Sequence, residues 1–226
     1  MFLTLDAVLN AEELEDICKK LAVAEFADGK STAGWHAQLV KHNQQLAPND
    51  PYWSEHQARI KAALNRHPLF QPAVQPDVLH TLLLSRYEAG MSYGSHVDNA
   101  LMGHNENGQR YRSDISWTLF LSPPDSYVGG ELVIEGSEGE RQIKLAAGSA
   151  VIYPSSYLHR VEPIVSGVRL AAVGWVQSLV RDPAQREILF DLEAARRSLF
   201  RQHGKTPEFD LISKTHANLL RRWADC

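Results

Sequence analysis

The sequence has few of the features that mark secreted, membrane or nucleic-acid-binding proteins. Its only two cysteines, Cys18 and Cys226, predict free thiols in a reducing cytoplasm and no disulfide framework. No run approaches the roughly 18–20 apolar residues of a transmembrane helix. The opening MFLTLDAVLNAEELED lacks a basic n-region, so no secretory signal is expected. A net charge of −4 gives no reason to expect nucleic acid or an acidic membrane as a partner.

What the chain does have is a long central region of short β-rich runs. Its 226 residues suffice for one sizeable domain with an appendage. From residue 79 to 180, runs such as ISWTLFLS, GELVIEG and SAVIYP alternate with Gly, Pro, Ser and Asp, and few helical signals interrupt them. Many short strands with turn residues between them predict a sandwich or a barrel, of which the jelly roll is one form.

Helical signals flank this region on both sides. Asn10 with Glu13 predicts the start of a first helix, and Pro51 opens a second, with a strand-like stretch at 35–46 between them. Asp182 and Pro183 begin a third helix that ends near Gly204, and a last helix is expected over 207–223. The predicted fold is therefore mostly β with flanking helices, divided into residues 1–180 and a helical C-terminal extension at 181–226.

The stretch SHVDNA at 95–100 contains the first candidate metal ligands. His96 and Asp98 follow a strand-like segment, and side chains at i and i+2 of a strand share a face. His159, in the later strand-like run LHRVEPI, is the best third ligand, because a jelly roll brings distant strands side by side. Two histidines and one carboxylate form the facial triad typical of non-haem Fe(II) oxygenases. The alternative for each histidine is an ordinary core or surface residue.

Arg169 lies in the apolar run VRLAAVGW, ten residues after His159. Alternation places Arg169, Ala171, Val173 and Trp175 on one face of a strand. A buried guanidinium needs an anion, which it binds through two parallel hydrogen bonds. That anion is either a ligand carboxylate or a carboxylate of the protein, and the sequence alone leaves both open. The polar stretch 99–114 is expected to form a long loop, and its position directly after Asp98 suggests a lid over the site.

The ordered series of residues resembles a known family. That series comprises Tyr87, His96-Val97-Asp98, Gly129-Gly130-Glu131-Leu132, Gly148, His159 and Arg169. It resembles the Fe(II)/2-oxoglutarate-dependent dioxygenases of the prolyl-4-hydroxylase-like branch, and most closely the bacterial PKHD-type (PiuC-like) hydroxylases. The likeness covers nearly the whole chain, including the C-terminal helices, and implies a double-stranded β-helix.

The resemblance also implies roles for individual residues. His96, Asp98 and His159 would ligate Fe(II), Arg169 would bind the distal carboxylate of 2-oxoglutarate, and Tyr87 would hydrogen-bond this cosubstrate. The implied activity hydroxylates a substrate with O2, releases succinate and CO2, and uses L-ascorbate as reductant. Because Asp98 occupies the position that related halogenases replace with a small residue, hydroxylation is favoured over halogenation.

Several alternatives stay open at this stage. A non-catalytic metal- or ligand-binding jelly roll is the main rival to an enzyme, and a regulator that binds a partner through residues 182–226 is another. The apolar stripe of these helices is expected to pack on the barrel or on another subunit of a homo-oligomer. The substrate is a peptidyl residue, a free amino acid or a small molecule related to iron uptake. We expect a cytoplasmic enzyme with no nucleic-acid or membrane partner.

Overall fold

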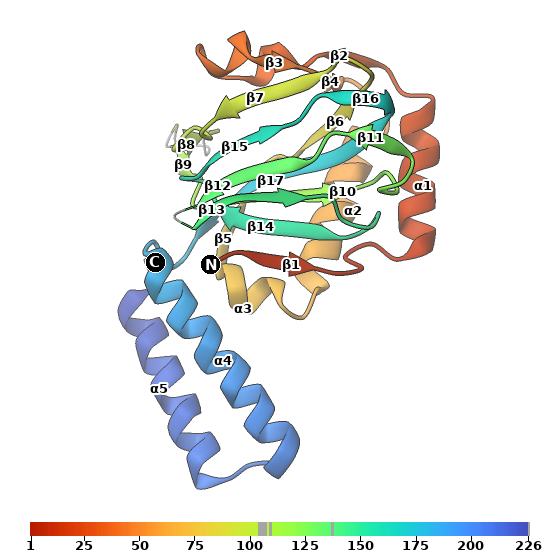
Figure 1. Ribbon diagram of the computed structural model, residues 1–226. Helices are drawn as coiled ribbons and strands as arrows, with labels where there is room; N and C mark the ends of the chain where they lie inside the picture. The colour runs from red at the N-terminus through yellow and green to blue at the C-terminus, as the bar shows by residue number, and fades with distance from the viewer. Residues whose placement is uncertain (104–107, 109, 137, 226) are drawn as a thin grey trace.

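Two β-sheets packed face to face form the body of the molecule (Figure 1). The computed structural model describes the chain except residues 104–107, 109, 137 and 226. The larger sheet has the strand order β1-β14-β10-β17-β6-β4-β2, with β5 added on β17. The smaller sheet has the order β13-β12-β15-β7-β3, and the pairs β11–β16 and β8–β9 stand apart from both. The predicted double-stranded β-helix with flanking helices is confirmed.

The strands are short, as the spacing of turn residues predicted. Their bounds are β1 Leu3–Leu5, β2 Phe26–Asp28, β3 Lys41–His42, β4 Gln44–Leu46, β5 Pro76–Leu79, β6 Leu83–Tyr87, β7 Ser92–His96, β8 Leu101–Met102, β9 Tyr111–Arg112, β10 Ile115–Phe120, β11 Tyr127–Gly129, β12 Leu132–Gly136, β13 Gly139–Ile143, β14 Ala150–Pro154, β15 Leu158–Val161, β16 Ile164–Gly167 and β17 Arg169–Ser178. The helices are α1 Ala11–Ala22, α2 Trp53–Arg66, α3 Phe70–Val74, α4 Pro183–His203 and α5 Pro207–Trp223, with 3-10 turns η1 Gly29–Thr32 and η2 Ala37–Leu39.

The two faces of the larger sheet support two separate cores. On the outer face, Trp117 and Leu119 of β10 pack in one cluster with Ile17 of α1 and Ile60 of α2. On the inner face, Phe120 belongs to a second cluster that lies between the sheets. A strand covered on both faces is apolar along its whole length. That is why ISWTLF is buried throughout and shows no simple alternation.

The central strand β17 has the predicted alternation. Ala172 and Val176 join the core beneath the helices. Arg169, Val173 and Trp175 face the space between the sheets, where they line a cavity. This alternation places a charged side chain inside the double-stranded β-helix, next to the site described below.

The C-terminal hairpin begins and ends at the predicted residues. Asp182 caps α4 through the N–H groups of Ala184 and Gln185, and Thr206 caps α5 through the N–H of Phe209. The hairpin projects from the barrel beside α3 (Figure 1). None of the residues of α5 is fully buried. Most of the apolar surface that α5 contributes therefore faces only α4 or the solvent.

Two segments differ from the expectations. The stretch 35–46 was expected to be strand-like, but its first part forms η2, where Val40 donates to the carbonyl of Ala37, and only its second part forms β3 and β4. The expected loop 99–114 is paired at its ends, as β8 and β9, and its central residues 104–107 and 109 lie outside the described part of the chain. Over the residues described, no helix combines the length and the apolar character needed to cross a membrane.

Candidate functional site

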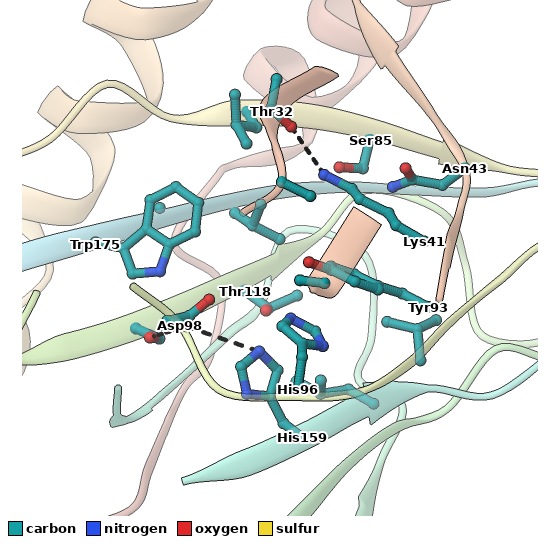
Figure 2. Close-up of a pocket in the computed structure, with 18 of the residues that line it drawn as sticks. Thr32, Lys41, Asn43, Ser85, Tyr93, His96, Asp98, Thr118, His159 and Trp175 are labelled. Carbon is teal, nitrogen blue, oxygen red and sulfur yellow. Dashed lines mark hydrogen bonds and ion pairs between the residues drawn. The ribbon is translucent and has the colours of Figure 1, made fainter. Parts of the chain in front are cut away.

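His96, Asp98 and His159 converge at one end of the space between the sheets (Figure 2). β7 and β15 are antiparallel neighbours, and His159 lies directly opposite His96 in their register. The two imidazole centroids are 4.3 Å apart, and Nε2 of His159 lies 3.7 Å from Oδ2 of Asp98. One potential ligand atom from each residue lies within 4.8 Å of the other two. The three side chains could therefore hold a single metal ion.

The position of Asp98 has a different cause from the one the sequence suggested. β7 ends at His96, so Asp98 lies beyond the strand and the i, i+2 argument does not apply to it. A hydrogen bond from Oγ of Ser116 to Oδ2 of Asp98, 2.6 Å long, fixes the carboxylate instead. Oγ of Ser155 lies 2.8 Å from Oγ of Ser116 and extends this chain of hydroxyl groups.

Backbone carbonyls determine the tautomer of both histidines. Nδ1 of His96 lies 2.8 Å from the carbonyl oxygen of Gly94, and Nδ1 of His159 lies 3.1 Å from that of Tyr157. A carbonyl can only accept, so each Nδ1 carries the proton and each Nε2 keeps its lone pair. Burial, with the neighbouring His159, lowers the pKa of His96 to about 4. A neutral imidazole with a free Nε2 is the form that binds a metal.

Arg169 is a buried cation without a protein anion. Its side chain is 1% exposed, and none of the ion pairs formed by the described residues includes it. The guanidinium carbon is 5.2 Å from the ring centre of Tyr87 and 5.3 Å from that of Phe120. Nε of Arg169 and the nearby hydroxyl of Tyr127 have no hydrogen-bond partner in the part of the chain that is described. The interpretation of Arg169 as one half of a protein ion pair is therefore not supported.

Gly130 provides the room that the Arg169 side chain needs. Its φ is +70°, a conformation that favours glycine. A Cβ at this position would lie 3.1 Å from Cδ of Arg169 and 2.3 Å from Cδ1 of Ile164. Tyr87, which is directly opposite Arg169 in the β6–β17 register, closes the other side. Burial raises the pKa of Tyr87, so its hydroxyl keeps its proton and remains a hydrogen-bond donor.

The triad and Arg169 open into one cavity of about 240 Å³. Apolar side chains such as Leu132 and Val161 line part of the wall. Trp175 also lines the cavity (Figure 2). A cavity with a metal-binding corner, a guanidinium that has no carboxylate partner and apolar walls fits a small dicarboxylate bound at a metal ion.

Sequence reasoning missed a second group of polar residues in this cavity. These residues are Lys41 of β3, Asn43 between the strands and Gln45 of β4; all three are buried and line the cavity. The stretch KHNQQL begins with five consecutive polar residues and shows no alternation. Such a run is normally typical of a solvent-exposed segment, so it did not indicate burial.

Comparison with known proteins identifies the family. The profile of the 2OG-Fe(II) oxygenase superfamily matches residues 82–177, and that of the PKHD-type hydroxylase C-terminal domain matches residues 183–225. A PKHD-type hydroxylase from Acaryochloris marina is 62% identical over 225 residues, which is 100% of both chains. The chain belongs to the PKHD-type hydroxylases. A PKHD-type hydroxylase from Synechococcus elongatus is 57% identical over 225 residues, again 100% of both chains.

Solved structures show the same fold for this PKHD-type hydroxylase. A Pseudomonas putida prolyl-4-hydroxylase superposes with a TM-score of 0.53 at 19% identity, covering 78% of this chain and 92% of that one. HygX from Streptomyces hygroscopicus, solved with nickel, 2-oxoglutarate and hygromycin B bound, gives a TM-score of 0.52 at 14% identity, covering 79% and 84%. At these identities the likeness establishes the fold alone.

Family membership decides between the alternatives that the sequence left open. The protein is an Fe(II)- and 2-oxoglutarate-dependent dioxygenase, so the prediction of an enzyme is confirmed over a non-catalytic jelly-roll protein. Enzymes of this superfamily share Fe(II) as the cofactor and 2-oxoglutarate and O2 as cosubstrates. The family name leaves the substrate unidentified.

Proposed function

We propose that this hydroxylase binds Fe(II) through His96, Asp98 and His159 and binds 2-oxoglutarate through Arg169 and Tyr87. The observation that carries the proposal is the unpaired guanidinium of Arg169 in the same cavity as the triad. A buried cation without a protein partner is costly unless a ligand supplies the anion. The distal carboxylate of 2-oxoglutarate is an anion of the right kind. The nickel and 2-oxoglutarate bound in HygX support this assignment by analogy of fold.

The residues of the chain would bind, orient and shield the reactants. When bound, iron and 2-oxoglutarate supply the oxidising chemistry that hydroxylates a C–H group and leaves succinate and CO2. Gly94 and Tyr157 keep both imidazoles in the metal-binding tautomer, and Ser116 holds Asp98 in place. Arg169 and the hydroxyl of Tyr87 orient the cosubstrate through directional hydrogen bonds. The apolar walls restrict the access of water during the reaction.

The test of the cosubstrate site is the variant Arg169→Ala. It keeps the metal ligands and removes a bidentate, charge-assisted contact worth roughly 2–5 kcal/mol, so 2-oxoglutarate should bind roughly 30-fold to several-thousand-fold more weakly. Anaerobic calorimetric titration into Mn(II)-loaded protein measures this affinity. Arg169→Lys should give an intermediate affinity, because it keeps the charge but loses the planar fork. An alanine variant that binds 2-oxoglutarate as tightly as the wild type would remove Arg169 from the cosubstrate site.

The test of the metal site uses alanine variants of the three proposed ligands. His96→Ala, Asp98→Ala and His159→Ala should each lose 2-oxoglutarate turnover, measured as succinate release in the presence of Fe(II) and ascorbate. Full activity in one variant would remove that residue from the triad. We propose L-ascorbate as the reductant that keeps the iron ferrous, and this assay run with and without ascorbate tests that role.

Three further parts of the proposal concern the whole chain. We propose that residues 1–180 form the dioxygenase domain and residues 181–226 an extension that mediates homo-oligomer formation. The apolar side chains of Ile188, Phe200 and Leu211 on this extension are exposed. We propose a cytoplasmic location, in keeping with the free thiol of Cys18. The substrate would be a peptide or a small molecule, as in the prolyl hydroxylase solved with a hypoxia inducible factor peptide and in HygX.

A further inference from the structure

The cavity contains a second buried cation, Lys41. It has no role in the proposed binding of the metal or the cosubstrate. The Lys41 residue is 3% exposed, and Nζ donates to Oγ1 of Thr32 at 2.8 Å. That hydroxyl is a neutral partner. Two carboxylates, those of Asp98 and Asp28, act on Nζ electrostatically, but neither lies within ion-pair distance of it. Nζ also lies 5.2 Å from the ring centre of Tyr93. An ammonium group has three donors, so at least part of its hydrogen-bonding capacity remains free.

The amide of Asn43 is a second buried polar group in this cavity. Asn43 is 5% exposed and lines the same cavity. Neither Oδ1 nor Nδ2 of Asn43 makes a hydrogen bond of good geometry within the part of the chain that is described, although the amide lies close enough to the Tyr87 hydroxyl to favour its ionised form. Lys41, Asn43 and Ser85 all line this cavity and appear in the same part of the view in Figure 2. A buried polar group without a hydrogen-bond partner destabilises the folded protein. Two such groups in one cavity therefore indicate that a ligand supplies the missing partners.

The position of Lys41 points to the substrate side of the reaction centre. The ring of Tyr93 stacks on that of His96, with centroids 3.6 Å apart and an interplanar angle of 18°. Lys41 lies over the same Tyr93 ring, so a single aromatic ring separates the ammonium from a proposed metal ligand (Figure 2). In a substrate whose group is bound by Lys41, the carbon that is hydroxylated would therefore lie only a few bonds from that group.

The charges in the cavity favour a monoanion. In the proposed complex, the charges of Fe(II), doubly ionised 2-oxoglutarate, Asp98 and Arg169 cancel. Lys41 is the other fully charged side chain among the described residues that line the cavity, and it has no carboxylate in direct contact, since Asp98 and Asp28 act on it only from beyond ion-pair distance. Burial lowers the pKa of Lys41 to about 8, which still leaves most of the population protonated at neutral pH. A carboxylate would both neutralise the ammonium and accept a hydrogen bond from the Asn43 amide.

We propose that Lys41, with Asn43, binds a carboxylate of the substrate, so that the enzyme acts on a small acid or on the C-terminal residue of a chain. This inference rests on the proposed function, because it assumes that Arg169 and the triad already hold the cosubstrate and the metal. It excludes substrates whose only groups near the hydroxylated carbon are neutral amides.

The experiment observes Lys41 directly by NMR. Protein with selectively 13C-labelled lysine is loaded with Zn(II), which is diamagnetic, and saturated with 2-oxoglutarate so that the Arg169 site is filled. N-acetylglycine is then titrated, with N-acetylglycinamide as the uncharged probe of the same shape. We expect the acid to shift the Lys41 Cε resonance saturably, with an affinity about 10–100-fold higher than that of the amide. The spectrum of Lys41→Arg assigns the resonance.

Two variants keep the test independent of folding. Lys41→Met should lose the preference for the acid and should bind 2-oxoglutarate within about threefold of the wild type. Lys41→Arg should retain part of the preference because it keeps the charge. Equal binding of acid and amide, or an unchanged preference in Lys41→Met, overturns the inference while leaving the proposed function intact. A loss of 2-oxoglutarate binding in Lys41→Met also overturns it, because Lys41 would then belong to the cosubstrate site. Failure of wild-type protein to bind 2-oxoglutarate at all would instead refute the proposed function.

Discussion

At the scale of single residues, the site depends on side chains that position the proposed metal ligands through hydrogen bonds. Ser116 is one example, because its hydroxyl fixes the carboxylate of Asp98 where no strand geometry does so. Partners of metal ligands typically contribute 10–100-fold to metal affinity or activity. The effect of removing Ser116 should therefore appear in metal binding, although this residue is not itself a proposed ligand.

We predict that Ser116→Ala weakens Co(II) or Fe(II) binding by about 10–100-fold with little change in melting temperature. Competition with a chromophoric chelator measures the affinity. Ser155→Ala is the matched control, because Ser155 contacts the hydroxyl of Ser116, and its effect should be smaller. If Ser116→Ala and the wild type bind the metal equally well, Asp98 does not need this hydrogen bond.

The burial of Lys41 leads to a second prediction at this scale, which concerns the stability of the folded protein. Burial lowers its pKa from 10.5 to about 8, so the unfolded chain binds more protons than the native protein between these two values. Below pH 8 the charged ammonium destabilises the native state by about 3 kcal/mol at most, and this penalty falls as the pH rises through 8 towards 10.5. The metal-free variant Lys41→Met should therefore melt several degrees higher than the wild type at pH 7.

The difference between the two melting temperatures should shrink between pH 8 and pH 10.5. Calorimetric melting curves at a series of pH values measure it. A difference that stays constant across this range would mean that the ammonium is not destabilised by burial. If the prediction holds, the native protein keeps a charged group in its cavity at the expense of stability, as binding sites commonly do.

At the scale of elements, local sequence signals predicted the helices better than the strands. Asn10 and Glu13 form the expected capping box of α1, and Asp182 and Thr206 cap α4 and α5 where the sequence indicated. These signals are local hydrogen bonds, so a single sequence contains them. β3 is only two residues long, and its pairing with β7 depends on residues about 50 positions away. No local pattern could reveal that pairing or the burial of Lys41.

The site was predicted to a similar, partial extent. His96, Asp98, His159 and Arg169 could be found because their residue types and spacing match a family pattern, and they do face one cavity. The partners Ser116, Gly94 and Tyr157 could not be found in this way. Two of these act through backbone carbonyls, which every residue has, so the sequence contains no trace of their role.

The close packing of β17 against β10 leads to a prediction at the scale of elements. A Cβ at Gly174 would lie 2.4 Å from the indole of Trp117. Trp117 is fully buried and cannot move outward, so Gly174→Ala should destabilise the protein by about 1–3 kcal/mol. Gly136→Ala in β12 is the control, since its Cβ would meet no atom closer than 3.7 Å. Urea denaturation measures both, and equal stabilities of the two variants would show that the core can adapt at Trp117.

At the scale of the whole molecule, the C-terminal hairpin projects from the barrel, and its last helix, α5, has no fully buried residue. α5 packs mainly on α4, and Phe200 and Phe209 contact each other with ring centroids 5.1 Å apart. Phe200 and Leu211 are nevertheless 53% and 56% exposed. Apolar side chains exposed on a projecting element are typical of an interface between protein chains.

We predict that the protein is a homo-oligomer in solution and that Phe200→Glu with Leu211→Glu reduces it to a monomer. Light scattering coupled to size-exclusion chromatography measures the mass of the particle. The exposed residue Val165, on β16, supplies the control variant Val165→Glu, which should leave the mass unchanged. A wild-type mass of 25.3 kDa, that of one chain, would refute the prediction. Succinate release should persist in the monomer, because these residues lie outside the proposed site.

The register of β7 and β15 would make the proposed metal ion a cross-link as well as a cofactor. His96 and His159 face each other across these two strands, so an ion held by both ties together neighbouring strands of the smaller sheet. Ligands that bind only the native state stabilise it in proportion to the logarithm of their concentration, so the melting temperature should rise steadily as Fe(II) or Ni(II) is added anaerobically. A cell short of iron would then hold this enzyme in its more easily unfolded form. The amount of the enzyme, and not only its turnover, would follow the supply of the metal.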